Sequence, residues 1–341
     1  MEEWENRMRN AIVLAAGKGT RMHSDLPKVL HKVCGMSMVS LVMNTLKSAN
    51  VDRVVTITGH AHELVEKELE GMCEFALQEP QLGTGHAVMQ AKQLENESGV
   101  TLVVYGDAPC ISKEMIEELY ETCGNADMVL LTVRYNGPSS FGRIIRNQNN
   151  EVERIVEFKD CNEEEKSITE LNSGFYAFKN ESLFEALKEL KNDNAQKEYY
   201  LTDVLEILKN KGKVIQAVVT EDYDLVQGVN DCVELAHANE TMRKRINTKW
   251  MKEGVTMYDP ETTYLSPEVT LGKDVILYPN VHLYGKTTIG DFTTILSGSY
   301  LENVVVGNHS VINASDIRNS EVKDNSMIGP WEHIEDNNRK D

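Results

Sequence analysis

The most constraining feature of this 341-residue chain is an aliphatic residue that recurs at every sixth position near its end. Seven positions stay in step, after which the register slips and then returns to six: Leu265, Leu271, Leu277, Leu283, Ile289, Ile295, Leu301, Val306, Ile312, Ile317, Val322, Ile328 and Ile334. A period of six is typical of a parallel β-helix, in which short strands form the faces of a prism and the aliphatic side chains fill its axis. A run of glycine-rich hairpins is the alternative, and the strict period disfavours it.

Upstream of the repeat, short apolar runs alternate with stretches of helical character. The predicted strands and helices follow one another at residues 11–16, 37–49, 51–59, 60–71, 86–96 and 100–107. Such alternation indicates a parallel sheet covered by helices on both faces. Next to the repeat, a stretch without Pro or Gly predicts a helix that stops at Gly254. The sequence therefore predicts three parts: an α/β domain over residues 1–230, a linker helix over 231–254 and a β-helix over 255–341.

Composition excludes several classes of protein. Lys plus Arg number 35 and Asp plus Glu 54, so the net charge of −19 argues against nucleic acid and anionic membranes as partners. The six cysteines are scattered without a C-x-x-C pair, which disfavours a zinc site or a disulfide framework and fits a reducing cytosol. The charged N-terminus has no apolar signal segment, and no apolar run reaches the roughly 20 residues of a membrane span. We therefore expect a cytoplasmic protein.

A glycine-containing loop, LAAGKGTRM at residues 14–22, follows the first predicted strand. Small residues let the backbone approach a ligand, and successive N–H groups can bind an anion. Lys18, Arg21 and Lys28 add positive charge that suits phosphate. The loop matches neither G-x-x-x-x-G-K-[ST] nor G-x-G-x-x-G, because Met22 stands at the last position of the second pattern. A phosphate site and a purely structural turn both remain open at this point.

Two further motifs point to a nucleotide. The loop QEPQLGTGH at residues 78–86 precedes a predicted helix, and the amide of Gln78 offers both a donor and an acceptor for a pyrimidine edge. Asp107, in Tyr105-Gly106-Asp107, ends an apolar strand, where open α/β sheets bind their ligands. Beside a triphosphate such a carboxylate can hold Mg2+. The alternative for an Asp at a strand end is a helix cap or a turn.

Together these loops, the Tyr-Gly-Asp triplet and the hexapeptide tail resemble bacterial N-acetylglucosamine-1-phosphate uridylyltransferases of the GlmU type. The resemblance runs from about residue 11 to about residue 330, with the motifs in the same order. It implies an α/β fold: a Rossmann-like nucleotidyltransferase domain followed by a short left-handed parallel β-helix. It also implies that UTP and N-acetylglucosamine 1-phosphate are joined, with Mg2+, to give UDP-N-acetylglucosamine and pyrophosphate.

The resemblance further implies roles for individual residues. Arg21 and Lys28 would be the catalytic cations, and Asp107 and Asn230 would hold Mg2+. The residues expected to contact the two substrates are Leu14, Ala15, Ala16, Gly17, Gln78, Gly83, Thr84, Tyr105, Gly106, Gly142, Glu157, Asn172 and Asn230. Each of them has an ordinary structural explanation when taken alone. Their joint appearance in the order of the family favours the functional interpretation.

The tail departs from the family pattern. The family carries a second activity, an acetyltransferase that uses acetyl-CoA at a longer trimeric β-helix. After Ile328-Gly-Pro, where the family has arginine, this chain has Glu332, His333 and Glu335, and the family's catalytic histidine has no counterpart. We therefore expect a homotrimer formed through the β-helix and no acetyltransferase activity. Three alternatives stay open: the same chemistry on another sugar such as glucose 1-phosphate, a non-catalytic sugar-nucleotide-binding scaffold, and an acetyltransferase built on the β-helix alone.

Overall fold

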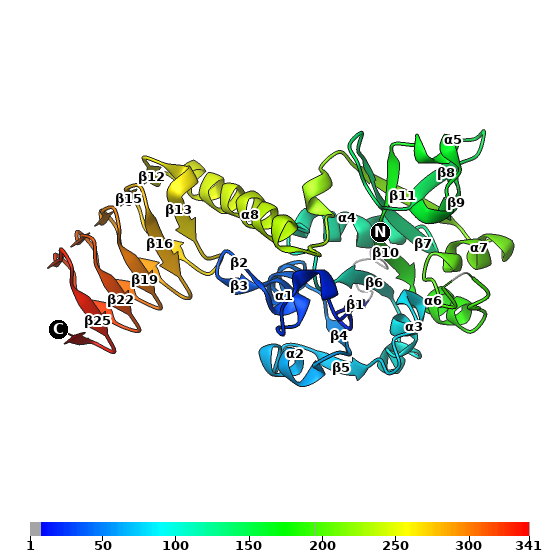
Figure 1. The fold of residues 1–341 in the computed structure, drawn as a ribbon, viewed down its shortest axis with the longest axis horizontal. Coiled ribbons are helices and arrows are strands. Elements are labelled where there is room, and N and C mark those ends of the chain that lie inside the picture. The colour runs from blue at the N-terminus through cyan, green and yellow to red at the C-terminus, as the bar shows by residue number, and fades with distance from the viewer. Residues whose placement is uncertain (1–7, 195, 341) are drawn as a thin grey trace. The chain divides into compact units, whose positions relative to one another are not determined.

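The computed structural model describes residues 8–194 and 196–340, which form two compact units (Figure 1). The first unit comprises the chain up to His31 and Met38–Glu234, and the second comprises Lys32–Ser37 and the chain from Leu235 onward. Within the described residues, no helix combines the length and the apolar character that crossing a membrane requires.

The first unit is built on a sheet with the strand order β11-β7-β10-β6-β1-β4-β5. These strands are β11 (Ile215–Thr220), β7 (Met128–Arg134), β10 (Glu170–Lys179), β6 (Val100–Tyr105), β1 (Arg9–Leu14), β4 (Arg53–Thr58) and β5 (Glu74–Leu77). Strand β1 lies parallel to both β4 and β6, as the alternation in the sequence predicts. The carboxyl ends of these three strands therefore meet at one edge of the sheet.

The prediction of a wholly parallel sheet is wrong at β10, which runs antiparallel to both β6 and β7. After β7 the chain forms the hairpin β8 (Arg143–Arg146) and β9 (Val152–Val156). It then re-enters the sheet at the end where β7 left it, since Glu170 pairs with Arg134. Parallel neighbours require a crossover that returns the chain to the opposite end, and this connection does not supply one.

Helices cover both faces of the sheet. They are α1 (Met38–Ser48), α2 (His62–Glu68), α3 (Thr84–Met89), α4 (Lys113–Cys123), α5 (Glu163–Lys166), α6 (Asn180–Leu187) and α7 (Asp203–Asn210). Side chains of β1 alternate between the two cores: Ala11 and Val13 pack with residues of α1 and α4, whereas Ile12 and Leu14 pack with residues of α3, α6 and α7. This alternation explains why β1 reads as a continuous apolar run, because a strand with both faces buried has no polar side.

The second unit contains the hairpin β2 (Lys32–Val33) and β3 (Met36–Ser37), most of α8 (Cys232–Lys252) and a parallel β-helix. Its strands stack in three parallel columns. The first column is β12 (Thr256–Met257), β15 (Ile276–Leu277), β18 (Thr294–Ile295), β21 (Val311–Ile312) and β24 (Met327–Ile328). The second is β13 (Thr263–Leu265), β16 (Val281–Tyr284), β19 (Tyr300–Glu302), β22 (Asp316–Arg318), β25 (His333–Glu335) and the antiparallel β26 (Asn338–Lys340). The third is β14 (Thr270–Leu271), β17 (Thr288–Ile289), β20 (Val305–Val306) and β23 (Glu321–Val322).

The hexapeptide positions form the axis of this β-helix, as the sequence predicts. Most of them are buried in one core, and Ile328 packs against it. The slips in the repeat fall at the corners, so that Leu283 pairs with Leu301 and Leu301 pairs with Ile317 although the second coil is two residues shorter. Asn and Asp are frequent because many corner residues have positive φ, which these side chains tolerate better than most.

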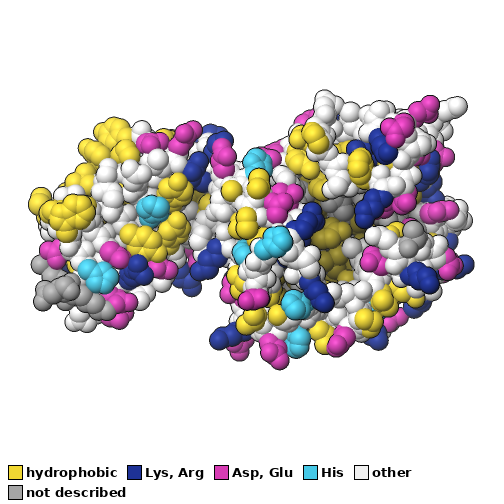
Figure 2. Space-filling view, in the orientation of Figure 1, with side chains coloured by type: hydrophobic (Ala, Val, Ile, Leu, Met, Phe, Trp, Pro, Cys, Tyr) yellow, Lys and Arg dark blue, Asp and Glu magenta, His cyan; other side chains and the backbone are white. Residues whose placement is uncertain are grey.

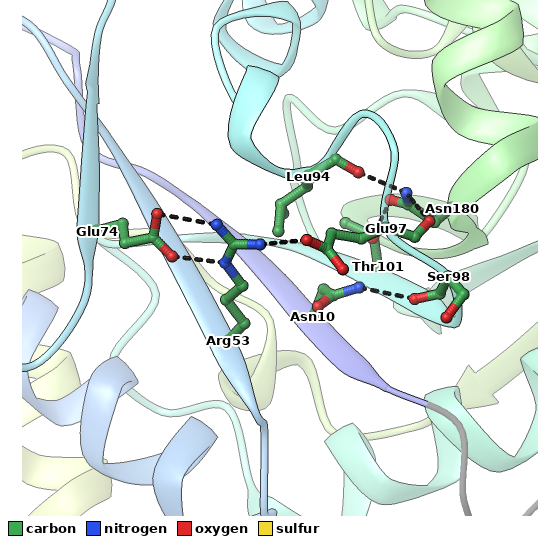
Figure 3. A network of polar contacts seen from close by, with 8 residues as sticks. All are labelled: Asn10, Arg53, Glu74, Leu94, Glu97, Ser98, Thr101 and Asn180. Carbon is green, nitrogen blue, oxygen red and sulfur yellow. Dashed lines mark hydrogen bonds and ion pairs between the residues drawn. The ribbon is translucent and has the colours of Figure 1, made fainter.

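A polar network fastens the amino ends of the central strands in the first unit (Figure 3). Asn180, at the start of α6 and 1% exposed, donates from Nδ2 to the carbonyl oxygens of Leu94 and Glu97 at 2.6 and 2.7 Å. Its Oδ1 accepts from Thr101 Oγ1 of β6 at 2.6 Å. Beside it, Arg53 of β4 bonds both Glu74 and Glu97. The network therefore joins β4, β5, β6 and α6 at the end of the sheet opposite the glycine-containing loop.

We expect Asn180→Ala to destabilise the first unit by about 2 kcal/mol or more, because three buried hydrogen-bonding groups lose their partner at once. Hydrogen–deuterium exchange of the slowest amides in β1 and β6 measures the effect, and about 2 kcal/mol corresponds to roughly 30-fold faster exchange. The exposed Asn149→Ala serves as the matched control, with exchange expected to be unchanged. Equal exchange rates in the two variants would contradict this view of Asn180.

Candidate active site

A cavity of about 1140 Å³ opens at the carboxyl ends of β1 and β6 in the first unit. Figure 2 shows a hollow in this unit, with basic side chains near its edge. Its lining includes most of the residues that the sequence proposes for substrates: Leu14, Ala15, Ala16, Gly17, Lys28, Gln78, Gly83, Thr84, Tyr105, Asp107, Gly142, Glu157 and Asn172. These residues come from many parts of the chain, and the fold brings them to one hollow.

Three proposed residues lie outside this lining. Arg21 is exposed on the short 3-10 helix η1 (Thr20–Met22) of the first loop. Gly106 lies behind the wall, where an added Cβ would meet Val39, Leu14 and Val29 at 3.3 to 3.4 Å. Asn230 lies next to Lys28, one layer out from the lining.

The lining also contains residues that sequence reasoning missed, among them Gln81, Phe158 and Tyr176. Gln81 is instructive, because its Nε2 donates to the carbonyl of Ala16 and so ties the second loop to the first. The sequence signal was its place inside the QEPQLGTGH motif. Tyr176 had no such signal, since its neighbours Phe175, Ala177 and Phe178 in β10 are core residues.

The first loop bends so that Lys28 can pack beneath it. Gly19 has a φ of +62°, and a Cβ there would lie 2.5 Å from the Cβ of Lys28. Only glycine combines this backbone conformation with so close an approach. Lys28 begins the 3-10 helix η2 (Lys28–Leu30) and points its ammonium toward the carboxyl end of β6.

Two oxygen atoms converge on that ammonium. Lys28 Nζ forms an ion pair with Asp107 Oδ2 and donates to Asn230 Oδ1 at 3.0 Å. The backbone holds the two oxygens in place, since Val229 N–H donates to the Asp107 carbonyl at 2.8 Å and Asn230 N–H donates to Glu234 at 2.6 Å. A cation-binding position thus exists between Asp107 and Asn230, and the protein's own ammonium fills it.

No group of three or more His, Cys, Asp or Glu side chains among the described residues is arranged to hold a metal ion. The oxygens of Asp107 and Asn230 are nevertheless the donor types that Mg2+ prefers, and they already face one cation. The donor set therefore fits a divalent cation that takes its remaining ligands from substrate and water.

At the opposite side of the cavity the second loop is held by the segment around Tyr199. Gly85 N–H donates to the Tyr199 carbonyl at 2.8 Å, and Tyr199 N–H donates to the Leu82 carbonyl at 2.8 Å. Leu201 N–H donates to Thr84 Oγ1 at 3.2 Å. Gly83 has a φ of +102°, and a Cβ there would lie 2.6 Å from the Tyr199 carbonyl oxygen. The glycines of this loop are thus required by close backbone contact.

The third wall comes from the hairpin β8–β9 and from an irregularity in β10. The pairing of β10 with β7 shifts between Asn172 and Tyr176, and Tyr176 Oη donates to Asn172 Oδ1 at 3.0 Å. Asn172 N–H donates to the Gly142 carbonyl at 2.9 Å, which brings these two residues together. A bulge of this kind redirects side chains away from the regular sheet pattern.

Burial raises the pKa of the Glu157 carboxyl, and the nearby Asp160 and Asp203 carboxylates raise it further. Burial also raises the pKa of Asp203, with a contribution from Glu206. Tyr105 is half-buried in the lining, and desolvation together with the charges of Asp107 and Glu157 raises its pKa. This side of the cavity is acidic, and it suits a ligand that donates hydrogen bonds through hydroxyl groups.

Comparison with known proteins agrees with this geometry. The family described as MobA-like NTP transferase domain matches residues 11–207. Proteins named "Bifunctional protein GlmU" from Halalkalibacterium halodurans, Listeria monocytogenes serotype 4a and Limosilactobacillus reuteri are 46%, 47% and 47% identical over 329 residues. In each case the match covers 96% of this chain and 72% of the relative.

A crystal structure of HddC from Yersinia pseudotuberculosis complexed with GMP-PN is similar in fold, with a TM-score of 0.53 and 20% identity. The similarity covers 69% of this chain and all of HddC. Together with the relatives and the matching domain family, it makes the first unit a nucleotidyltransferase domain. This chain belongs to the GlmU family.

Proposed function

We propose that this chain is a UDP-N-acetylglucosamine pyrophosphorylase, which joins UTP to N-acetylglucosamine 1-phosphate and releases pyrophosphate. The observation that carries the proposal is the cation position between Asp107 and Asn230, with Lys28 in it, at one wall of a cavity whose two other walls suit a pyrimidine and a sugar. Membership of the GlmU family supports the same activity.

The phosphates of UTP would lie along the first loop. Backbone groups of residues 14–17 approach the cavity, and Arg21 and Lys28 supply positive charge. Asp107 Oδ2 and Asn230 Oδ1 would hold Mg2+, which when bound neutralises phosphate charge and polarises phosphate oxygens. Lys28 would then be free to pair with the phosphates instead of with its two present partners.

The base and the sugar would occupy the other two walls. Gln78, Gly83 and Thr84 line the cavity and would face the uracil. Of the remaining proposed substrate contacts, Tyr105, Gly142, Glu157 and Asn172 line the cavity, whereas Gly106 lies behind its wall. The poorly hydrated Glu157 carboxylate is suited to accept hydrogen bonds from sugar hydroxyls, since it has little competing water.

The reaction needs no covalent intermediate on the protein. An oxygen of the sugar phosphate attacks the α-phosphorus of UTP in line, a new P–O bond forms, and the bond to the β-phosphate oxygen breaks with its electron pair leaving on pyrophosphate. The attacking oxygen is already ionised, so no general base is required. Both reactants are anions, and the chain therefore contributes chiefly by positioning them and by charge neutralisation through Arg21 and Lys28.

The direct test is pyrophosphate release from UTP with a panel of sugar 1-phosphates, with and without Mg2+. We expect N-acetylglucosamine 1-phosphate to give the highest kcat/KM, at least about tenfold above glucose 1-phosphate, because a fitted pocket distinguishes substrates that differ by one substituent. A preference for glucose 1-phosphate would contradict the assigned sugar and favour a uridylyltransferase that acts on glucose 1-phosphate. No release with any sugar would favour a binding scaffold.

The proposed Mg2+ position at Asp107 and Asn230 leads to a second prediction. We expect Asp107→Ala to lower kcat/KM by about 100-fold or more, the loss typical when one preorganised electrostatic group is removed. Binding of Mn2+, followed by electron paramagnetic resonance with UTP present, should weaken in parallel. Asp274→Ala, an exposed carboxylate in the β-helix, is the matched control and should leave both quantities unchanged. Normal Mn2+ binding by Asp107→Ala would reject the metal role.

We further propose that the chain forms a homotrimer through its β-helix. In the second unit Tyr258, Met327 and Trp331 are 62%, 78% and 85% exposed, and Figure 2 shows apolar side chains gathered on this part of the molecule. Exposed apolar surface of this kind favours association with further copies. The absence of acetyltransferase activity and a cytoplasmic location stay predictions.

Size-exclusion chromatography with light scattering on the eluted protein tests the proposed trimer. We expect a mass three times the 38.4 kDa of the chain, independent of concentration in the micromolar range. A mass of one chain under the same conditions would contradict the proposal.

A further inference from the structure

The base-facing amide of Gln78 is fixed in one orientation by two partners. Gln78 is only 5% exposed. Its Nε2 lies 2.9 Å from the Gly83 carbonyl oxygen, which can only accept a hydrogen bond, so the atom there must be the NH2 nitrogen. The same Nε2 lies 3.2 Å from His86 Nδ1. Both amide hydrogens are therefore used within the second loop.

His86 can accept the second hydrogen only in one form. Nδ1 must carry the lone pair, which requires a neutral ring protonated on Nε2. Burial lowers the pKa of His86, which favours the neutral ring. Gln90 Nε2 lies 3.2 Å from His86 Nε2, but it also donates to the His86 carbonyl oxygen at 2.9 Å and so has a partner that does not depend on the ring. Gln90 is partly exposed, whereas Gln78 is buried. The tautomer is thus set by Gln78.

This arrangement leaves Gln78 with one free group, its Oε1, which has no hydrogen-bond partner among the described residues and is not sealed from the cavity. An oxygen acceptor at this wall matches a ring N–H, which uracil carries at N3. Cytosine has a lone pair at N3, so it would place acceptor against acceptor and leave a desolvated polar group unpaired.

We propose that His86 is a positioning residue for nucleotide specificity: by accepting from Gln78 it holds the amide so that the cavity presents an acceptor, and thereby selects uracil over cytosine. The inference rests on the proposed function, because it takes the second loop as the base site. His86 acts through Gln78 and need not touch the nucleotide.

The test compares UTP with CTP, first by calorimetric binding to the 341-residue chain with Mg2+ and then by kcat/KM with N-acetylglucosamine 1-phosphate. The wild type should prefer UTP in both measurements. His86→Leu removes the acceptor and frees the amide to turn, and we expect the UTP-to-CTP ratio to fall at least about tenfold, through KM more than kcat. We expect the same fall in the ratio for His86→Ala, which keeps the test valid if the leucine variant misfolds.

Two variants separate this role from simple packing. In His86→Asn the Oδ1 atom can take the place of Nδ1 as acceptor, so the ratio should return to within about threefold of the wild type. Gln90→Ala removes the other neighbour of the ring and should leave the ratio unchanged. A packing role would weaken UTP and CTP alike and leave their ratio intact.

The outcomes distinguish the inference from the proposed function. An unchanged ratio in both His86→Leu and His86→Ala, or a lost ratio in His86→Asn, would overturn the inference. If the wild type binds UTP over CTP and the variants behave as expected, but no UDP-sugar forms, the proposed function fails and the inference stands. If the wild type binds both nucleotides equally, the acceptor at Gln78 does not read the base and the inference fails.

Discussion

The parallel pairing of β1 with β4 and β6 is the constraint on which the rest of the nucleotidyltransferase unit depends. It brings three carboxyl ends to one edge, and β5 pairs parallel with β4 at the same edge, so that the first loop, Gln78 and Asp107 face a common hollow. Both faces of β1 are buried, which fixes its register against either neighbour. The polar network at Asn180 secures the far ends of the same strands, and the site end is left free to carry irregular loops.

The charges of the site are arranged around one cation position, which the ammonium group of Lys28 occupies. In a chain with a net charge of −19, the half-buried Lys28 lies where two oxygens from distant segments meet. Lys28 balances Asp107 in this state, and a metal ion arriving with an anionic substrate would balance it equally well. The same site can thus exchange one cation for another without ever burying the Asp107 charge alone.

Specificity has a different physical source, since it depends on hydrogen-bond direction and not on charge. Gly83 and His86 accept both hydrogens of the Gln78 amide. A glutamine can both donate and accept hydrogen bonds, but Gln78 is left with only an acceptor, its Oε1, for a ligand. On the opposite wall, the bulge between Asn172 and Tyr176 makes β10 part of the cavity lining. Family relatives account for the reaction, whereas these local contacts account for how this chain would choose its substrates.

The sequence by itself determined the β-helix and the helical covering of the sheet, because both depend on local period. The glycine-containing motifs and the family resemblance indicated only part of the cavity lining. Only the tertiary structure decided the antiparallel direction of β10, the pairing of Lys28 with Asn230 and the link from Gln81 to Ala16. These features join segments far apart in the chain. Local pattern records which face of an element is buried, but it does not record which distant partner covers that face or meets its polar groups.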